Sequence, residues 1–183
     1  MINRLVAVLL FILLLPLFIL IGIFIYLEDG LPIFFEQKRV GQNCTFFMIL
    51  KFRTMRLNTP NVATHLLNNP EKYLLKTGKF LRRYSLDELP NIINVISGEM
   101  VFVGPRPALF NQEDLMELRI ANGVDSLIPG ITGWAQINGR DEISLDLKVS
   151  LEKDYLDRKS ILFDWYILYK TFLKVVNRNN VTH

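Results

Sequence analysis

The sequence is poor in the residues that form disulfides and bind transition metals. Cys44 is the single cysteine, so a disulfide framework is excluded and a reducing compartment is acceptable. The two histidines, His65 and His183, are too few and too far apart for a zinc site. No Asp-x-Asp triplet occurs, which argues against phospho-aspartate hydrolases and metal-dependent glycosyltransferases that carry this signature.

The chain also lacks a strong excess of either charge. Its 183 residues include 21 Lys and Arg against 18 Asp and Glu, which gives a net charge of +3 and a pI near 9.0. This balance is too weak to argue for a nucleic-acid partner, and it suits an anionic membrane surface or phosphate ligands. With 50% hydrophobic residues and no internal repeat, we expect one domain in addition to the N-terminal segment.

That N-terminal segment, residues 2–27, is nearly all apolar. Its interruptions are Asn3, Arg4, Pro16, Gly22 and Tyr26. As a helix rising about 1.5 Å per residue, it is long enough to cross a bilayer. It has no small-residue cleavage pattern, so we expect it to stay attached rather than act as a removable signal peptide.

Two placements in the membrane are open for this segment. It can span once, or it can enter one leaflet, bend and leave on the same side. Pro16 lies at its midpoint, where the missing N–H kinks a helix. Arg4 precedes the segment and Lys38 and Arg39 follow it, so the positive-inside rule is satisfied if both ends are cytoplasmic. The polar backbone at a bend is an argument against re-entry in lipid.

The remainder predicts an α/β (α+β) fold, mostly helical with short strands. We expect strands at 45–55, at 100–103 and after the Pro/Gly loop that begins at 127, with a tight Asn-Gly turn before residue 140. We expect helices at 74–84, 111–122, 145–155 and 161–176. The last helix mixes aromatic residues with Lys170 and Lys174, which is consistent with a membrane interface or with core packing.

Residues 81–107 hold the most informative stretch. Asp87 and Glu88 are adjacent carboxylates, and Ser85 and Glu88 have capping-box spacing, so a helix should begin there and stop at Gly98. A helix N-terminus would keep Asp87 ionised and attract phosphate. An ionised carboxylate among phosphate-binding groups can attack phosphorus. The alternative is an ordinary cap with first-turn acids.

Cationic side chains suitable for phosphate recur along the chain. Lys51 and Arg53 are two residues apart on a predicted strand, so they share a face that could hold a diphosphate or simply be exposed. Arg82 precedes the acidic pair, Arg106 follows it in a Gly-Pro-Arg-Pro turn, and Arg140 lies at the Asn-Gly turn. Arginine binds phosphate oxygens in bidentate geometry.

Taken together, these motifs resemble those of the bacterial sugar transferases, the monotopic phosphoglycosyl transferases, and in particular their small members. The resemblance covers essentially the whole chain to about residue 176, and its motifs occur in the family's order. They are Gln37-Lys38-Arg39-Val40-Gly41, Lys51-Phe52-Arg53-Thr54-Met55, Leu81-Arg82-Arg83, Asp87-Glu88-Leu89-Pro90, Gly98-Glu99-Met100, Val103-Gly104-Pro105-Arg106-Pro107, Pro129-Gly130-Ile131-Thr132-Gly133-Trp134 and Asn138-Gly139-Arg140.

The resemblance implies an enzyme that moves a sugar 1-phosphate from a UDP-sugar to a polyprenyl phosphate such as undecaprenyl phosphate. It implies release of UMP, dependence on Mg²⁺, and a role in starting glycoconjugate assembly. Asp87 and Glu88 match the family's catalytic dyad, with Asp87 as the nucleophile that becomes a phospho-aspartate. Metal binding falls to Asp87 and Glu88, with the split between them left open, and Lys51, Arg53, Arg82, Arg106 and Arg140 are the candidate substrate-binding residues.

The same resemblance favours a re-entrant N-terminal helix (1–28) broken at Pro16. A cytoplasmic catalytic domain (29–176) would then lie on the bacterial inner membrane, followed by a loose tail (177–183). Downstream glycosyltransferases are the protein partners it suggests. The alternative from a different functional class is a catalytically inactive, membrane-anchored scaffold of a glycan pathway.

Overall fold

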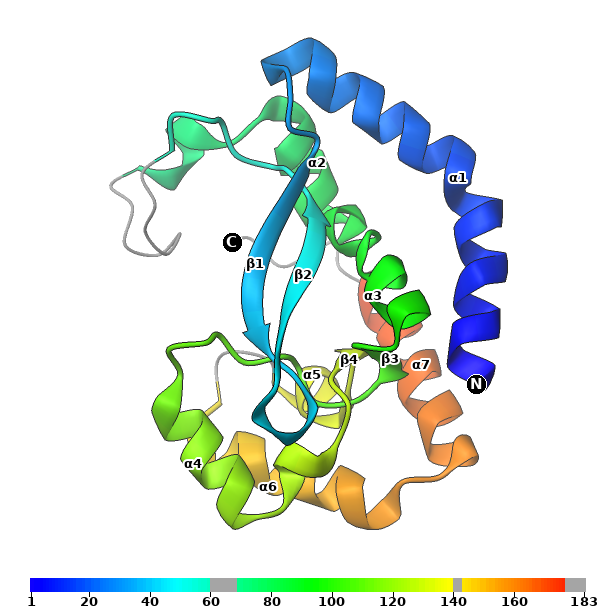
Figure 1. The fold of residues 1–183 in the computed structure, drawn as a ribbon, viewed down its shortest axis with the longest axis vertical. Helices are drawn as coiled ribbons and strands as arrows, with labels where there is room; N and C mark the ends of the chain where they lie inside the picture. Colours follow the sequence, from blue (N-terminus) through cyan, green and yellow to red (C-terminus); the bar gives the residue numbers. More distant parts are fainter. Residues whose placement is uncertain (60–68, 140–142, 177–183) are drawn as a thin grey trace.

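The computed structural model describes residues 1–59, 69–139 and 143–176. A long N-terminal helix, α1 (Ile2–Asp29), runs along one side of the other elements (Figure 1). The helix is continuous through Pro16, and Figure 1 shows it bending near its middle. The break expected at Pro16 is thus a bend within one helix, as expected where a proline removes a hydrogen bond. The helix packs mainly against α3 (Asn91–Ser97) and also touches α2 (Lys76–Arg83).

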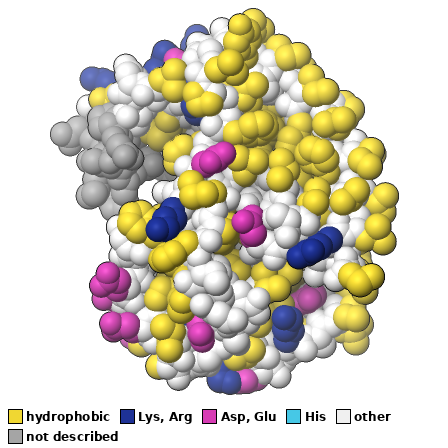
Figure 2. Space-filling view, viewed as in Figure 1, with side chains coloured by type: hydrophobic (Ala, Val, Ile, Leu, Met, Phe, Trp, Pro, Cys, Tyr) yellow, Lys and Arg dark blue, Asp and Glu magenta, His cyan; other side chains and the backbone are white. Residues whose placement is uncertain are grey.

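Most of α1 faces outward. Five of its residues are buried against the domain: Ala7, Phe18, Ile21, Gly22 and Ile25. Most of its other side chains are apolar and exposed, and Figure 2 shows hydrophobic side chains gathered along this edge of the molecule. Among the described residues, α1 is the one helix that is long and apolar enough to cross a membrane.

The strands form two small sheets. β1 (Phe34–Val40) and β2 (Phe46–Phe52) are antiparallel and joined by a 3₁₀ turn at Gln42–Cys44. β3 (Val101–Val103) and β4 (Gly130–Thr132) are short and parallel. Together with the many helices, these strands confirm the predicted α/β class with short strands.

The remaining helices follow the predicted ranges to within a few residues. They are α4 (Glu113–Ala121), α6 (Leu145–Arg158) and α7 (Ile161–Val176). A short helix that was not predicted, α5, spans Trp134–Asn138, and 3₁₀ turns lie at Pro70–Tyr73, Leu86–Glu88 and Val124–Ser126. One apolar cluster joins α1, α2, α3 and β2, and a second joins α4, α6 and α7. Phe102 of β3 packs against both clusters, so the parallel strands lie between them. The predicted tail, 177–183, lies outside the described residues.

The segment after β4 differs from the prediction. We expected a strand leading to a tight Asn-Gly turn, but Trp134–Asn138 is the short helix α5. β4 pairs in parallel with β3, and within residues 69–139 and 143–176 no antiparallel strand follows it that would need such a turn. Instead, the Trp134 ring packs on Phe163 with ring centroids 5.1 Å apart, which favours the helical turn that holds it there.

The approach of α2 to the chain after β2 leaves no room at Gly78, and this generates a stability prediction. A Cβ at Gly78 would lie 2.2 Å from the carbonyl oxygen of Thr54. We therefore expect Gly78→Ala to lower the free energy of unfolding by about 1–3 kcal/mol, because rigid backbone must shift. Denaturant unfolding in detergent measures it. Lys79→Ala, at an exposed position of the same helix, is the control and should change the free energy by less than about 0.5 kcal/mol. Equal effects of the two changes would contradict the close approach.

Candidate active site

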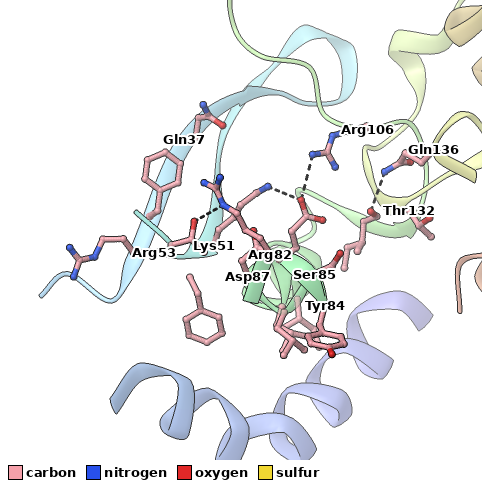
Figure 3. A pocket seen from close by; sticks show the side chains of 18 of the residues that line it. Gln37, Lys51, Arg53, Arg82, Tyr84, Ser85, Asp87, Arg106, Thr132 and Gln136 are labelled. Carbon is pink, nitrogen blue, oxygen red and sulfur yellow. Dashed lines mark hydrogen bonds and ion pairs between the residues drawn. The ribbon is translucent and has the colours of Figure 1, made fainter. Parts of the chain in front are cut away.

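A cavity of about 1290 Å³ lies between α1, the β1–β2 hairpin and the parallel strands (Figure 3). One part of its wall is apolar and includes Leu10 and Leu14 of α1 and Ile92 of α3. Another part carries most of the predicted site residues: Lys51, Arg53, Arg82, Asp87, Glu88 and Arg106. The fold thus brings together cations and carboxylates that are up to 55 residues apart in sequence, beside the helix with membrane character.

Asp87 and Glu88 lie on a 3₁₀ turn, Leu86–Glu88, rather than at the start of α3. The predicted helix start at Ser85 is therefore wrong, since α3 begins at Asn91. Ser85 has a left-handed backbone (φ 56°) and forms no side-chain cap. The reason is Pro90, which cannot donate to the carbonyl of Leu86 and would clash with it inside an α-helix. The predicted stop at Gly98 is confirmed by its φ of 91°.

Glu88 is held between two cations. Lys51 Nζ donates to Glu88 Oε1 over 2.7 Å, and Arg106 Nη2 lies 3.5 Å from the same oxygen (Figure 3). Burial by itself would raise the pKa of Glu88, but Lys51 and Arg106 together lower this pKa to about 2. Glu88 is therefore a fixed negative charge at neutral pH.

Asp87 is in the opposite electrostatic situation. Burial raises its pKa, and the negative charge of Glu88 raises it further, while Lys51 and Arg82 act in the lowering direction. The turn that carries Asp87 is not the start of α3, so the helix N-terminus that was expected to favour its ionised form does not lie at this residue. The oxygens of a carboxylate with a raised pKa are more basic than those of an ordinary aspartate.

Arg82 reaches the site from the last turn of α2. Its Nε donates to Thr54 Oγ1 over 2.9 Å. Burial lowers the pKa of Arg82, whereas the nearby charge of Asp87 raises it. Thr54 is thus a supporting residue that we did not identify from the sequence, although it lies within a motif between Lys51 and Met55. Gly78 allows the α2 backbone to approach Thr54 closely enough for this contact.

Arg53 lines the same cavity but is already bound to the end of α1. Its Nη1 donates to Asp29 Oδ2 over 2.7 Å, and its Nη2 donates to the carbonyl oxygens of Asp29 and Gly30 over 3.0 and 2.6 Å. The side chain is 6% exposed. Lys51 and Arg53 therefore have different partners. Arg53 holds the end of α1, a role that its position two residues after Lys51 did not suggest. Arg140, like His65 and His183, lies outside the described residues.

Two carboxylates are available for a metal ion. Among the described residues, no group of three or more His, Cys, Asp and Glu side chains could hold one. Mg²⁺ commonly binds one or two carboxylates and completes its shell with water and substrate phosphates. Both cations contact Glu88 through its Oε1 atom. Asp87 and Glu88 therefore fit the role of carboxylate ligands to a magnesium ion that also binds a diphosphate.

Comparison with known proteins identifies the family of this chain. A family model described as bacterial sugar transferase matches residues 1–178. The chain belongs to the bacterial sugar transferase family. This membership confirms the resemblance seen in the sequence and, with it, the expectation of a phosphoglycosyl transferase enzyme.

Relatives of this chain in the family include both short and long proteins. The chain is 41% identical to the sugar transferase EpsL of Bacillus subtilis over 150 residues, which cover 82% of this chain and 73% of that protein. It is 36% identical to the exopolysaccharide production protein ExoY of Sinorhizobium fredii, over 92% of this chain and 81% of that protein. A UDP-glucose:undecaprenyl-phosphate glucose-1-phosphate transferase of Escherichia coli is 36% identical, over 92% of this chain but 38% of that longer protein.

The opposed environments of the two carboxylates predict opposite effects of two substitutions on the pKa of Asp87. Glu88→Gln removes a negative neighbour and should lower this pKa, whereas Lys51→Met removes a positive neighbour and should raise it. Titration of ¹³C-labelled aspartate by NMR measures both shifts. Asp114→Asn, at an exposed position of α4, serves as the control and should leave the Asp87 titration unchanged. Shifts of the same sign in the first two variants would show that the charge arrangement is wrong.

Proposed function

We propose that this enzyme transfers a sugar 1-phosphate from a UDP-sugar to undecaprenyl phosphate or a similar polyprenyl phosphate, releases UMP, and so starts the assembly of a glycoconjugate. One observation carries the proposal. The Asp87 carboxylate lies in a cavity with Lys51, Arg82 and Arg106, and the wall of that cavity includes the apolar helix α1. A water-soluble donor and a lipid acceptor can meet in such a chamber.

The reaction has two steps. An Asp87 oxygen attacks the phosphorus that bears the sugar, the bond to the UMP oxygen breaks, and a phospho-aspartate carrying the sugar forms. An oxygen of the polyprenyl phosphate then attacks the same phosphorus, which frees Asp87 and gives the sugar–diphosphate lipid.

The surrounding charges support this division of labour. Lys51 and Arg106 neutralise Glu88 and leave donor groups that can bind phosphate oxygens, while Arg82 lies near Asp87. These cations offset the repulsion between Asp87 and an anionic diphosphate. We propose Mg²⁺ as the cofactor, with Asp87 and Glu88 as its protein ligands; when bound, it neutralises charge on the donor phosphates.

The contacts at both ends of α1 support a re-entrant placement in the bacterial inner membrane. At one end, Glu28 accepts hydrogen bonds from the backbone N–H groups of Lys76 and Thr77 at the start of α2. At the other end, the Arg4 guanidinium lies against Gly98, where a Cβ would be 1.8 Å from Arg4 Nη2. A straight 28-residue helix is about 42 Å long, so a spanning α1 would carry one of these contacts across the bilayer.

Helix α7 supports the same orientation, with the catalytic domain resting on the cytoplasmic face. Its exposed side chains are largely apolar or aromatic: Ile161, Leu162, Trp165, Tyr166, Tyr169 and Phe172. Lys170 and Lys174 are exposed on the same helix. Aromatic residues mixed with lysine are typical of helices that lie at the boundary of anionic lipid.

The role of Asp87 predicts a complete loss of transfer in Asp87→Asn, because an amide is not a competent nucleophile. UMP release from a panel of UDP-sugars with undecaprenyl phosphate should fall by roughly 10³-fold or more. The exposed Asp114→Asn serves as the control and should keep full activity. An inactive scaffold would instead release no UMP in its wild-type form and would keep its function in Asp87→Asn.

The covalent intermediate can be tested with the wild-type enzyme. Incubation with UDP-sugar alone should release UMP and leave an acid-stable, base-labile mass addition on the peptide that contains Asp87. Absence of this adduct under single-turnover conditions would favour direct transfer in a ternary complex.

Re-entry predicts that both ends of α1 are accessible from one side. With Cys44 replaced, cysteines introduced at Asn3 and at Glu36, both exposed, should react with a membrane-impermeant thiol reagent from the cytoplasmic side. A cysteine at Leu13, on the exposed apolar face of α1, should be protected by lipid. Reaction of one end only would show that the helix spans.

A further inference from the structure

The turn that carries Arg106 is fixed by hydrogen bonds to its carbonyl groups. Tyr155 Oη of α6 lies 3.1 Å from the Val103 carbonyl and 2.7 Å from Asp164 Oδ1, so these two acceptors share its one hydroxyl proton. The backbone N–H of Gly130 donates to the Pro105 carbonyl over 2.9 Å. Such a turn is held in one conformation by the elements behind it, although two of its residues are prolines that donate nothing.

The carbonyl of Arg106 itself is held by a buried arginine. Arg119 Nη2, from α4, donates to this carbonyl over 2.9 Å. Glu152, from α6, binds Arg119 in a bidentate ion pair, with Nε–Oε2 and Nη2–Oε1 distances of 2.8 and 2.5 Å. The two side chains are 5% and 2% exposed. A chain of contacts thus runs from α6 through α4 to the backbone of the residue that reaches Glu88.

Stability alone is a poor explanation for this pair. Removing two charges from water is costly, and apolar residues of similar volume often replace a buried ion pair without loss of stability. What apolar residues do not supply is a donor for the Arg106 carbonyl. The Arg106 side chain is 35% exposed and ends 3.5 Å from Glu88, so its reach to the site depends on where its backbone is held.

We propose that the buried Arg119–Glu152 pair positions Arg106, so that its guanidinium stands beside Glu88 and the donor phosphates. Arg119 and Glu152 are positioning residues that act through the backbone of Arg106, with no contact to substrate required. This role rests on the proposed transfer from a UDP-sugar at Asp87.

The test is a double-mutant cycle between the pair and Arg106. Arg119→Met combined with Glu152→Leu replaces the pair by apolar residues and should remain folded. We expect kcat/KM for the UDP-sugar to fall roughly 10- to 100-fold, the range seen when groups behind directly acting residues are removed. In an Arg106→Ala background the same replacement should lower kcat/KM by less than about twofold, because the side chain that the pair positions is no longer present. Binding of UDP without acceptor, measured by calorimetry, should show the same pattern.

The exposed ion pair between Lys153 and Asp157 on α6 provides the matched control. Asp157→Asn also removes one charge from this helix, and it should leave kcat/KM within about twofold of wild type. Transfer at the wild-type rate by the folded apolar variant would overturn the positioning role. So would an equal fold-loss in kcat/KM when the pair is replaced in the wild-type and in the Arg106→Ala background. Failure of the proposed function would look different, because the wild-type enzyme itself would then release no UMP from any UDP-sugar.

Discussion

The ion pair between Lys51 and Glu88 determines how the two carboxylates of the site differ. It joins the end of β2 to the 3₁₀ turn before α3 over 2.7 Å. Lys51 and Arg106, which contact the same oxygen of Glu88, lower the pKa of Glu88 and keep it negatively charged. That charge in turn helps raise the pKa of Asp87. Adjacent acids with pKa values moved in opposite directions are suited to different tasks. This difference supports the proposed attack by Asp87, with Glu88 supplying a fixed negative charge beside it.

The same strand connects the site to the apolar helix α1. Lys51 and Arg53 are two residues apart, and while Lys51 binds Glu88, Arg53 binds Asp29 and the last carbonyls of α1. The position of α1 and the position of the site cations are thus set by one short piece of chain. In the proposed reaction with a lipid acceptor, this connection would set the depth of Asp87 relative to the bilayer. Arg53, which the sequence suggested as a phosphate ligand beside Lys51, thus also holds the end of α1.

Much of the fold was predictable because local chemistry decides it. Gly98 ends α3 with a positive φ, and the periodic segments gave α2, α4, α6 and α7 with small errors at their ends. Two local rules competed in the remaining cases. The capping-box spacing of Ser85 and Glu88 predicted a helix start, but Pro90 prevented it. The Asn-Gly pair at 138–139 predicted a tight turn after a strand, but the residues before it form the short helix α5, whose Trp134 packs on Phe163.

By itself, the sequence determined the class of the protein, the apolar helix, the acidic pair and the cations that could serve it, because these depend on residue type and order along the chain. The tertiary structure decided which cation meets which carboxylate: Lys51 with Glu88, Arg82 near Asp87, Arg53 with Asp29, and Arg119 with Glu152. The last two pairs join residues 24 and 33 positions apart. The physical reason is that electrostatic energy depends on distance and burial, and both are set only when the helices pack.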